Sequence, residues 1–554
     1  GCPPARPAAC LLVCPRALAM AVFVNAFVAT GTGSRKPIGN PDMPGSLVLP
    51  PLAVWGNLAI YIAAWALLMW PQHLPLGRPC IAMVFATLAC GLRALCSAAW
   101  PEHGYPTVDI FGKVDVTPIA LLFGLMLVNA YLKDTGLWRH VERLLDSASP
   151  GILLAKVCAC SALMSAFLLN DTTCFVLTPT VLDLCARRRA RSALPYLMAV
   201  SMSSNIGSSL TTIGNPQNAL IASISPGITF LGFARAMLAP VSAGLVLNTA
   251  VLWWWFRREL VFESQSEGSL QDPLPCSFHA ALESLDEGAC AGASAARRLY
   301  VGAVASVVAA MLAGWFLGLA TDDVALAAGA ALMLARAVRR RLAGEGGGSS
   351  TETEFALGAV DYSILILFFG QFVLAGATVD TGLPQRAFHR VLGPCSDHLA
   401  SSPLCMLWFA GLVLVLSNLI SNVPVILMLE PLLQSQPAEG VVSMWISCAW
   451  VATVAGNLTM LGSAANLIVA HKAESRGEHS YTATNLGKVS TLPTIAITAL
   501  GVFLMPPLVP SGVWCVPAVG ASAACLAIAA AAAWSLCHAR PGSRVAGGCR
   551  EERA

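Results

Sequence analysis

Two short polar clusters interrupt apolar stretches of this chain. The first is Asn170-Asp171-Thr172-Thr173 and the second is Ser421-Asn422-Val423-Pro424. A proline follows each asparagine at the same distance, Pro179 and Pro431. Polar side chains are costly in hydrocarbon, and those that occur there commonly bind or conduct a solute. The clusters therefore indicate a site for a polar solute or an ion.

A second matched pair of motifs follows the clusters. Thr211 to Asn218 reads Thr-Thr-Ile-Gly-Asn-Pro-Gln-Asn, and Thr459 to Asn466 reads Thr-Met-Leu-Gly-Ser-Ala-Ala-Asn, 248 positions later. Amides and hydroxyls of this kind can replace the hydration shell of a neutral solute or help to coordinate an ion. The candidate ligands are Asn170, Asp171, Thr172, Thr173, Asn205, Ser209, Thr211, Gly214, Asn215, Asn218, Ser421, Asn422, Asn457, Thr459, Gly462, Ser463 and Asn466.

Two acids are candidates for proton coupling. Asp171 is the only acid in either cluster, and Glu430 is the only acid shortly after the second one. Low dielectric disfavours an unpaired carboxylate, so Asp171 is a natural proton carrier or, alternatively, a sodium ligand. Glu430 either shares this role or reaches the outer surface.

The residues around the clusters lack a fixed cation. No lysine or arginine occurs within 158–182, 194–222, 410–433 or 441–470. A neutral, hydroxyl-rich solute suits such a site, whereas an anion would need helix N-termini or a co-bound cation. The 19 cysteines lie largely in apolar segments without paired spacing, which favours packing over a disulfide framework or a metal site.

No motif for ATP binding, hydrolysis or nucleophilic catalysis is present, so we expect a gradient-driven process and not an enzyme. No cofactor is expected beyond a coupling proton or sodium ion.

The elements that position these residues are membrane helices. The chain is 56% hydrophobic and only 11% charged, which predicts an all-α polytopic protein embedded in a lipid bilayer, with about 12 spans. Its net charge of +3 gives no reason to expect a nucleic-acid partner. Arginines at 187–189, 257–258 and 339–341 mark the cytoplasmic side. Plasma and organelle membranes are not distinguished.

The matched motifs predict two copies of one unit. Repeat 1 covers 48–256 and repeat 2 covers 299–508, with a cytoplasmic linker at 257–298. An N-terminal segment with an extra span, 1–47, precedes them, and 509–554 forms a final span and cytoplasmic tail. Residues 151–185 and 403–433 are expected to be re-entrant hairpins, and 194–222 and 441–470 to be broken helices. An odd number of spans in each copy makes the repeats inverted in topology.

The motifs also resemble a known group. Ser165 to Thr178, Ser204 to Ser209, Gly214 to Asn218 and Ala455 to Val469 are similar to the citrate-transporter-like permeases of the ion transporter superfamily. Within that group the chain most resembles arsenite/antimonite efflux permeases and plant silicon efflux transporters. The resemblance implies an elevator, in which a transport domain carries the site across the membrane, with proton antiport and commonly a homodimer.

We therefore expect a secondary transporter that exports a small hydroxylated solute or oxyanion in exchange for protons. The alternatives are a sodium- or proton-coupled carrier of anions such as citrate, a sodium/proton exchanger, and a membrane receptor or scaffold that transports nothing.

Overall fold

The structure is a computed structural model. It describes residues 51–505 except 70–76, 102–111, 113, 137, 226, 264–290, 345–349, 398, 400, 401 and 437. The predicted segments 1–47 and 509–554 lie outside the described residues. Almost every described residue belongs to a helix or a short turn, and Ala190 and Phe262 form an isolated bridge.

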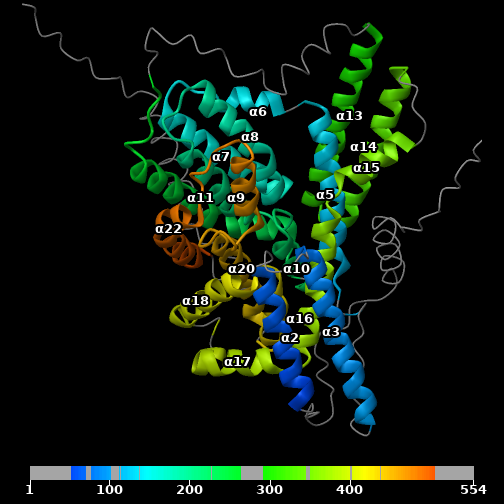
Figure 1. Ribbon diagram of the computed structural model, residues 1–554, viewed down its shortest axis with the longest axis vertical. Helices are drawn as coiled ribbons and strands as arrows, with labels where there is room; N and C mark the ends of the chain where they lie inside the picture. Colours follow the sequence, from blue (N-terminus) through cyan, green and yellow to red (C-terminus); the bar gives the residue numbers. More distant parts are fainter. Residues whose placement is uncertain are drawn as a thin grey trace, which may run out of the picture.

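The described helices follow a similar order in both halves of the chain, except that α15 and the short η3 occur in the second half alone (Figure 1). The first half contains α2 (Pro51–Met69), α3 (Arg78–Ala99), α5 (Val116–Asp134), α6 (Trp138–Leu145), α7 (Pro150–Leu168), α8 (Asn170–Arg187), α9 (Leu194–Ser208), α10 (Pro216–Ile224) and α11 (Phe230–Trp255). The second contains α13 (Ala291–Phe316), α14 (Thr321–Leu342), α15 (Ser350–Ala359), α16 (Tyr362–Val379), α17 (Leu383–Leu392), the short η3 (Gly393–Asp397), α18 (Pro403–Ile420), α19 (Asn422–Gln434), α20 (Ala438–Ala455), α21 (Ala464–Glu474) and α22 (Ala483–Leu504).

Seven of the described helices are long and apolar enough to cross a membrane: α3, α5, α7, α11, α13, α16 and α22. Shorter apolar helices add to them in α2, α18, α19 and α20. Three consecutive tryptophans, Trp253 to Trp255, end α11 on exposed positions, as is common at a membrane interface. The protein is therefore an all-α, multi-pass integral membrane protein.

The expected hairpins are present, and each returns to the end from which it started. At the first, Asp146 accepts a hydrogen bond from Lys156 of α7 and forms an ion pair with Arg188, just after α8. At the second, Cys395 is joined by a disulfide to Cys405 of α18, and the neighbouring Ser396 accepts a hydrogen bond from Gln436, just after α19. Both arms of a hairpin therefore begin and end at one connecting segment.

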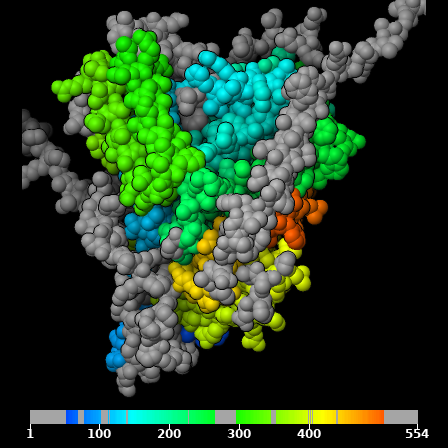
Figure 2. All heavy atoms as spheres, turned by 180° about the vertical axis from the view of Figure 1, so that it is seen from behind, coloured from blue at the N-terminus to red at the C-terminus, as the bar shows by residue number. Residues whose placement is uncertain are grey.

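The two hairpins open at opposite ends of the molecule. The amphipathic helices α6 and α17, which precede them, lie near opposite ends of the long axis in Figure 1. Seen from behind in Figure 2, the cyan region that includes the first hairpin is at the upper end, and the yellow-green region of the second is at the lower end.

Two pairs of long helices join the two halves of the chain. α3 packs against α16, with an ion pair between Arg93 and Asp380 at 3.7 Å, and α14 packs against α5, with an ion pair between Arg336 and Asp134 at 3.2 Å. The contacts are tight because Gly124 and Gly370 face backbone: a Cβ there would lie 2.6 Å from Ala325 and 2.9 Å from Ala82, respectively. Asp134 and Asp380, which end α5 and follow α16, respectively, thus each pair with an arginine of the other half.

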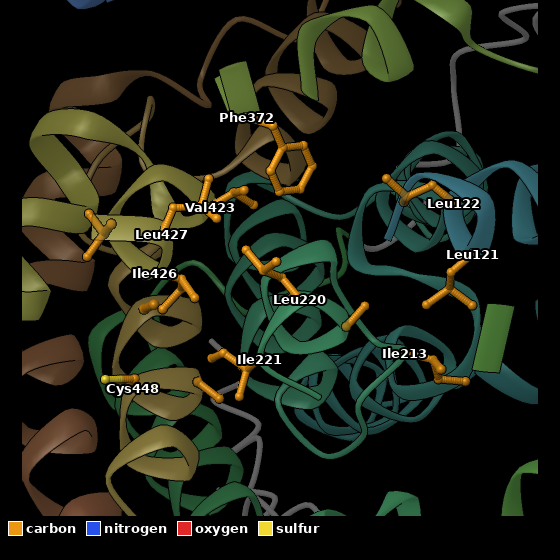
Figure 3. Packing of buried hydrophobic residues seen from close by; sticks show 14 of the residues in the cluster. Leu121, Leu122, Ile213, Leu220, Ile221, Phe372, Val423, Ile426, Leu427 and Cys448 are labelled. Carbon is orange, nitrogen blue, oxygen red and sulfur yellow. The ribbon is translucent and has the colours of Figure 1, made fainter. Parts of the chain in front are cut away.

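The buried apolar residues form two clusters. The larger one joins α2, α3, α5, α13, α14 and α16 to α10 and α19. Figure 3 shows Leu220 and Ile221 of α10 beside Val423, Ile426 and Leu427 of α19. The second cluster joins α7, α8 and α9 to α21, and it holds no described residue of α2, α3, α5, α13, α14 or α16. Of those six helices, α16 is the main contact of the second hairpin, through α19, whereas the first hairpin packs mainly with α9 and α21.

Candidate functional site

The two hairpin tips have the same backbone conformation. Leu169 between α7 and α8 has φ 70° and ψ 143°, and Ser421 between α18 and α19 has φ 69° and ψ 158°. Neither is glycine, and L residues in this region carry about 1–3 kcal/mol of strain. This conformation reverses the chain within one residue, so that Asn170 and Asn422 each begin the returning helix.

Asn170 reaches into the other half of the chain. Its Nδ2 donates to Oδ1 of Asn205 at 3.0 Å and approaches Oγ of Ser463 at 3.5 Å. Its backbone N–H donates to the carbonyl of Gly214 at 3.2 Å. The first tip is therefore joined to both broken helices.

Asn205 is the centre of this network. Besides Asn170, its Oδ1 accepts from Oγ of Ser463 at 3.0 Å, and its Nδ2 donates to Oδ1 of Asn457 at 2.9 Å and approaches that of Asn466 at 3.4 Å. All these side chains are buried. A fully connected buried amide network fixes the relative position of the two halves.

Thr453, in the second half of the chain, makes the corresponding contacts with the broken helix of the first half. Its hydroxyl accepts from Nδ2 of Asn215 at 3.1 Å and from Gln217 at 3.3 Å, and lies 3.4 Å from Oδ1 of Asn218. Thr453 stands 248 positions after Asn205, the same offset as the flanking motifs. The sequence analysis missed Thr453, although that offset applied to Asn205 would have found it.

In both broken helices, an asparagine that follows the break donates hydrogen bonds to two backbone carbonyls earlier in the chain. Nδ2 of Asn218 donates to the carbonyls of Ser208 (3.2 Å) and Thr211 (3.0 Å). Nδ2 of Asn466 donates to those of Gly456 (2.7 Å) and Thr459 (2.9 Å), again 248 positions later. These bonds satisfy carbonyls that the end of a helix leaves without partners.

The residues at the start of the next half-helices are matched too. Asn215 caps α10 by accepting from the N–H of Asn218 at 2.9 Å, and Ser463 caps α21 by accepting from the N–H of Ala465 at 3.3 Å. Such caps stabilise a helix that begins inside the protein.

Two threonines tie the breaks to the hairpins. Thr211 donates to the carbonyl of Ala166 in α7, and Thr459 donates to Oδ1 of Asn418 in α18 at 2.9 Å. Asn418 also donates to the carbonyl of Ala455 at 3.0 Å. Each tip is thereby fixed to the broken helix of its own half.

Several polar atoms at the tips have no protein partner in the described structure. They are the buried hydroxyl of Thr173 and the side-chain oxygens of Asn129 and Asn422. Asn129 of α5, which the sequence analysis did not consider, donates to the hydroxyl of Thr172 at 3.1 Å and to the carbonyl of Leu168 at 3.2 Å. Buried acceptors normally have partners, so these atoms are suited to bind a polar solute.

The remaining predicted residues surround this network. Asp171 and Thr172 are half-buried in the first turn of α8, while Ser209 donates to the carbonyl of Asn205 at 3.4 Å. Ser421 is half-buried at the second tip, and Gly462 adjoins Asn418. Glu430 is buried on α19 and accepts from Gln434 at 3.0 Å, so it faces the protein rather than the outer surface.

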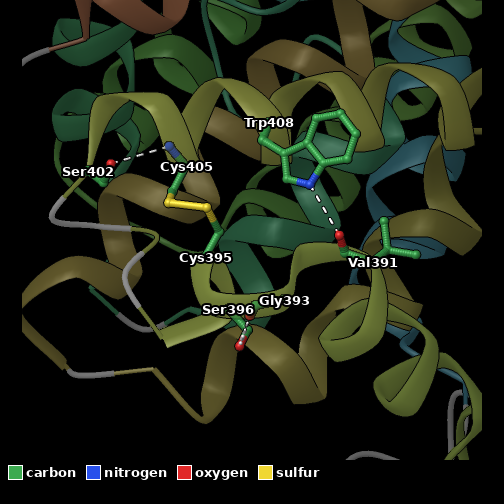
Figure 4. The surroundings of a disulfide bond; sticks show 7 residues. All are labelled: Val391, Gly393, Cys395, Ser396, Ser402, Cys405 and Trp408. Atoms are coloured by element: carbon green, nitrogen blue, oxygen red, sulfur yellow. Dashed lines mark hydrogen bonds between the residues drawn. A yellow bond between two sulfur atoms is a disulfide. The ribbon is translucent and has the colours of Figure 1, made fainter.

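One pair of cysteines departs from the packing role expected for them. Cys395 and Cys405 form a disulfide between η3 and the start of α18, next to the hydrogen bond from Trp408 to the carbonyl of Val391 (Figure 4). The cysteines within the buried helices, such as Cys158, Cys174 and Cys448, are free. No group of metal-ligating side chains occurs among the described residues.

Comparison with known proteins identifies relatives. A silicon efflux transporter of Oryza sativa subsp. japonica, LSI3, is 32% identical over 511 residues, covering 82% of this chain and 98% of the relative. A transporter of Dictyostelium discoideum named arsB is 26% identical over 525 residues, covering 78% of this chain and 87% of its own.

The crystal structure of the Alcanivorax borkumensis YdaH transporter aligns with a TM-score of 0.48 at 16% identity, covering 81% of this chain and all of that one. The model of the citrate transporter family matches residues 63–455. This chain therefore belongs to the citrate transporter family of membrane transport proteins.

Proposed function

We propose that this transporter exports a small hydroxylated solute, of the silicic acid or arsenite type, in exchange for protons. The observation that supports this proposal most is the chemistry of the tips. They offer amides and hydroxyls, and no lysine or arginine occurs within the surrounding residues 158–182, 194–222, 410–433 and 441–470. Hydroxyl groups of a neutral solute can donate to the oxygens of Asn129 and Asn422 and to the hydroxyl of Thr173.

The name of the rice relative supports the same class of solute, because that protein is a silicon efflux transporter.

We propose Asp171 as the residue that carries the coupled proton. It lies one position after Asn170, half-buried in the first turn of α8. An ionisable side chain at such a position is suited to take up a cation, either a proton or a sodium ion. Glu430 is a second candidate, and it accepts a hydrogen bond from Gln434 on its own helix, α19.

The coupling role is tested with Asp171→Asn in proteoliposomes. This variant should lose flux driven by a pH gradient and keep exchange of solute for solute. Undiminished proton-driven flux would remove Asp171 from the mechanism.

We further propose an elevator movement of two inverted repeats. α10 and α19 pack against α5 and α16, respectively, whereas their counterparts α21 and α8 lie in the separate cluster with α7 and α9. The tight Asn205 and Thr453 network keeps both hairpins in one unit. Movement of that unit would bring α8 against α5 and α21 against α16, in place of α10 and α19. The hairpin tips would then be exposed to the other side of the membrane.

A cation-coupled anion carrier is the second candidate. The family model that matches the chain is that of citrate transporters. An anion could be held by the N-terminus of α8 or α19 together with a bound sodium ion.

The deciding experiment places the purified protein in liposomes with an imposed pH gradient. Fluxes of arsenite, silicic acid, citrate and sodium are followed in parallel, with and without sodium. Proton-driven metalloid flux without a sodium requirement supports the proposal. Sodium-dependent citrate flux contradicts it and supports the anion carrier.

A further inference from the structure

Two lysines from different parts of the chain meet over one aromatic ring. Nζ of Lys472, in the last turn of α21, lies 3.9 Å from the centre of the Phe175 ring, and Nζ of Lys133, at the end of α5, lies 5.3 Å from it. Phe175 belongs to α8 and is 43% exposed. The ring thus has two cations beside it: Lys133 comes from α5, and Lys472 comes from α21, which packs against α8.

The lysines lie close to the first hairpin tip. Lys133 follows Asn129 by one helical turn, and Asn129 donates to Thr172 at 3.1 Å. Phe175 follows Asp171 by one turn on α8, so both lie on the same side of that helix. The lysines are therefore about one turn further along the helices than the tip, towards the end that carries Arg187 and Arg188.

Among the described residues, no carboxylate forms an ion pair with either ammonium group. Within the described structure neither Lys133 nor Lys472 forms an ion pair, although other charges at this end do: Arg476 with Asp183, and Arg188 with Asp146. The two ammonium groups are close enough for their charges to repel each other. Two like charges held together without a counter-ion favour the binding of an anion.

The other half of the chain has no such pair. The positions that correspond to Lys133, Phe175 and Lys472 are Val379, Leu427 and Ile224, at separations of 246, 252 and 248. The same separations hold for the matched pairs Gly124 and Gly370, Asn170 and Asn422, and Asn218 and Asn466, respectively. Val379 and Leu427 are buried, and Ile224 packs against the same cluster. The fold therefore needs only apolar packing at these positions, and the lysines serve a purpose at one end alone.

We propose that Lys133 and Lys472, both beside Phe175, form an anion subsite near the first hairpin tip, at the entrance that carries Arg187 and Arg188. Its ligand is an oxyanion with phosphate-like chemistry, supplied either as a free ion in solution or as a lipid headgroup. Ammonium groups bind such oxygens as charged hydrogen-bond donors. The subsite rests on the proposed function only in naming this end an entrance, because binding itself needs no transport.

The test measures thermal unfolding of the full chain in phosphatidylcholine nanodiscs as inorganic phosphate is added at constant ionic strength. A ligand that binds the folded state raises the unfolding temperature with concentration. We expect phosphate to stabilise the wild type, and Lys133→Gln or Lys472→Gln to raise the required phosphate concentration about tenfold. Lys488→Gln on α22 is the matched control, with an unchanged response.

A second arm identifies the source of the ligand. Nanodiscs that contain phosphatidylglycerol stabilise the wild type more than either glutamine variant if a lipid headgroup is the ligand, and free phosphate then adds nothing. Lys133→Arg and Lys472→Arg should restore the response, which separates lost charge from misfolding. A wild-type response that both glutamine variants share, or no response to phosphate and phosphatidylglycerol, overturns the subsite. Failure of metalloid flux in the wild type would refute the proposed function and leave this binding result unaffected.

Discussion

Asn205 and Thr453 stand 248 positions apart, and each binds the break in the broken helix of the other half. Asn205 contacts Ser463 and Asn466, and Thr453 contacts Asn215 and Asn218. Since Asn215 and Ser463 cap the half-helices that follow the breaks, the two contacts are equivalent under the exchange of halves. The halves are held together by polar contacts at the level of the breaks.

Removing the hydroxyl of Thr453 should therefore uncouple one of these contacts. Thr453→Val keeps the shape but leaves the buried amide of Asn215 without one acceptor, which costs about 1–3 kcal/mol. We expect a lower unfolding temperature in detergent and a solute flux reduced by about tenfold or more. Thr491→Val is the control, because the Thr491 hydroxyl donates to the carbonyl of Gly487 on its own helix, α22. Equal effects of the two variants would show that Thr453 contributes nothing across the halves.

Close packing of α7 on α9 should be sensitive to a single methyl group. A Cβ on Gly207 would lie 2.2 Å from the Cα and the carbonyl oxygen of Ala162, both backbone atoms that cannot move independently of α7. Overpacking of this kind costs about 1–3 kcal/mol or more, so Gly207→Ala should lower the yield of folded protein. Gly411→Ala, on α18 with no atom within 4 Å of the new Cβ, should be neutral or slightly stabilising. Size-exclusion chromatography and thermal unfolding compare the two.

The disulfide should fix the end of the second hairpin and report the side on which it lies. Disulfides persist in oxidising compartments. This one lies near α17, at the end of the molecule opposite the end that carries Arg187 and Arg188. Replacing Cys395 and Cys405 by serine should lower stability by about 2–3 kcal/mol. In a variant that keeps only these two cysteines, an impermeant maleimide should label them only after reduction, and only from the side opposite the arginines. Labelling without reduction would contradict the pairing.

The ion pair between Asp146 and Arg188, at the base of the first hairpin, should contribute the same stability at every pH in the physiological range. Hydrogen bonding to Arg188 lowers the pKa of Asp146 below its ordinary value of 3.8. A lowered pKa means that the ion pair stabilises the folded state above that value and is lost as the pH falls below it. Both side chains are 38% exposed, so the contribution is screened and stays below about 1 kcal/mol.

Asp146→Asn should consequently lower the unfolding temperature by the same small amount at pH 5 and pH 8. The difference from the wild type should disappear only below about pH 3.8. A difference that changes between pH 5 and pH 8 would contradict the assignment.

The fold could be predicted from the sequence where a signal was repeated. The hairpins at 151–185 and 403–433 and the breaks at Gly214 and Gly462 were predicted because polar residues recur in apolar segments at constant offsets. Asn129 and Thr453 could not be found from local patterns, since each is a single polar residue within a helix, and its role depends on what packs opposite.

The same limit applies to the lysines and the disulfide. Lys133 and Lys472 are single lysines in the last turns of α5 and α21, and only the packing of α5, α8 and α21 brings them to one ring. Cys395 and Cys405 are a pair because the chain turns back between η3 and α18, which their spacing alone did not reveal.

The claim that the two hairpin tips carry the solute is tested most directly by one flux measurement. Proteoliposomes under a pH gradient compare the wild type with Asn170→Ala and Asn422→Ala, using the solute among arsenite, silicic acid and citrate that the wild type carries. Asn485→Ala, in the first turn of α22, is the control. We predict that both tip variants insert and fold but lose at least about 90% of the flux, a loss of about 1.4 kcal/mol or more. Full flux in either folded tip variant would contradict the account.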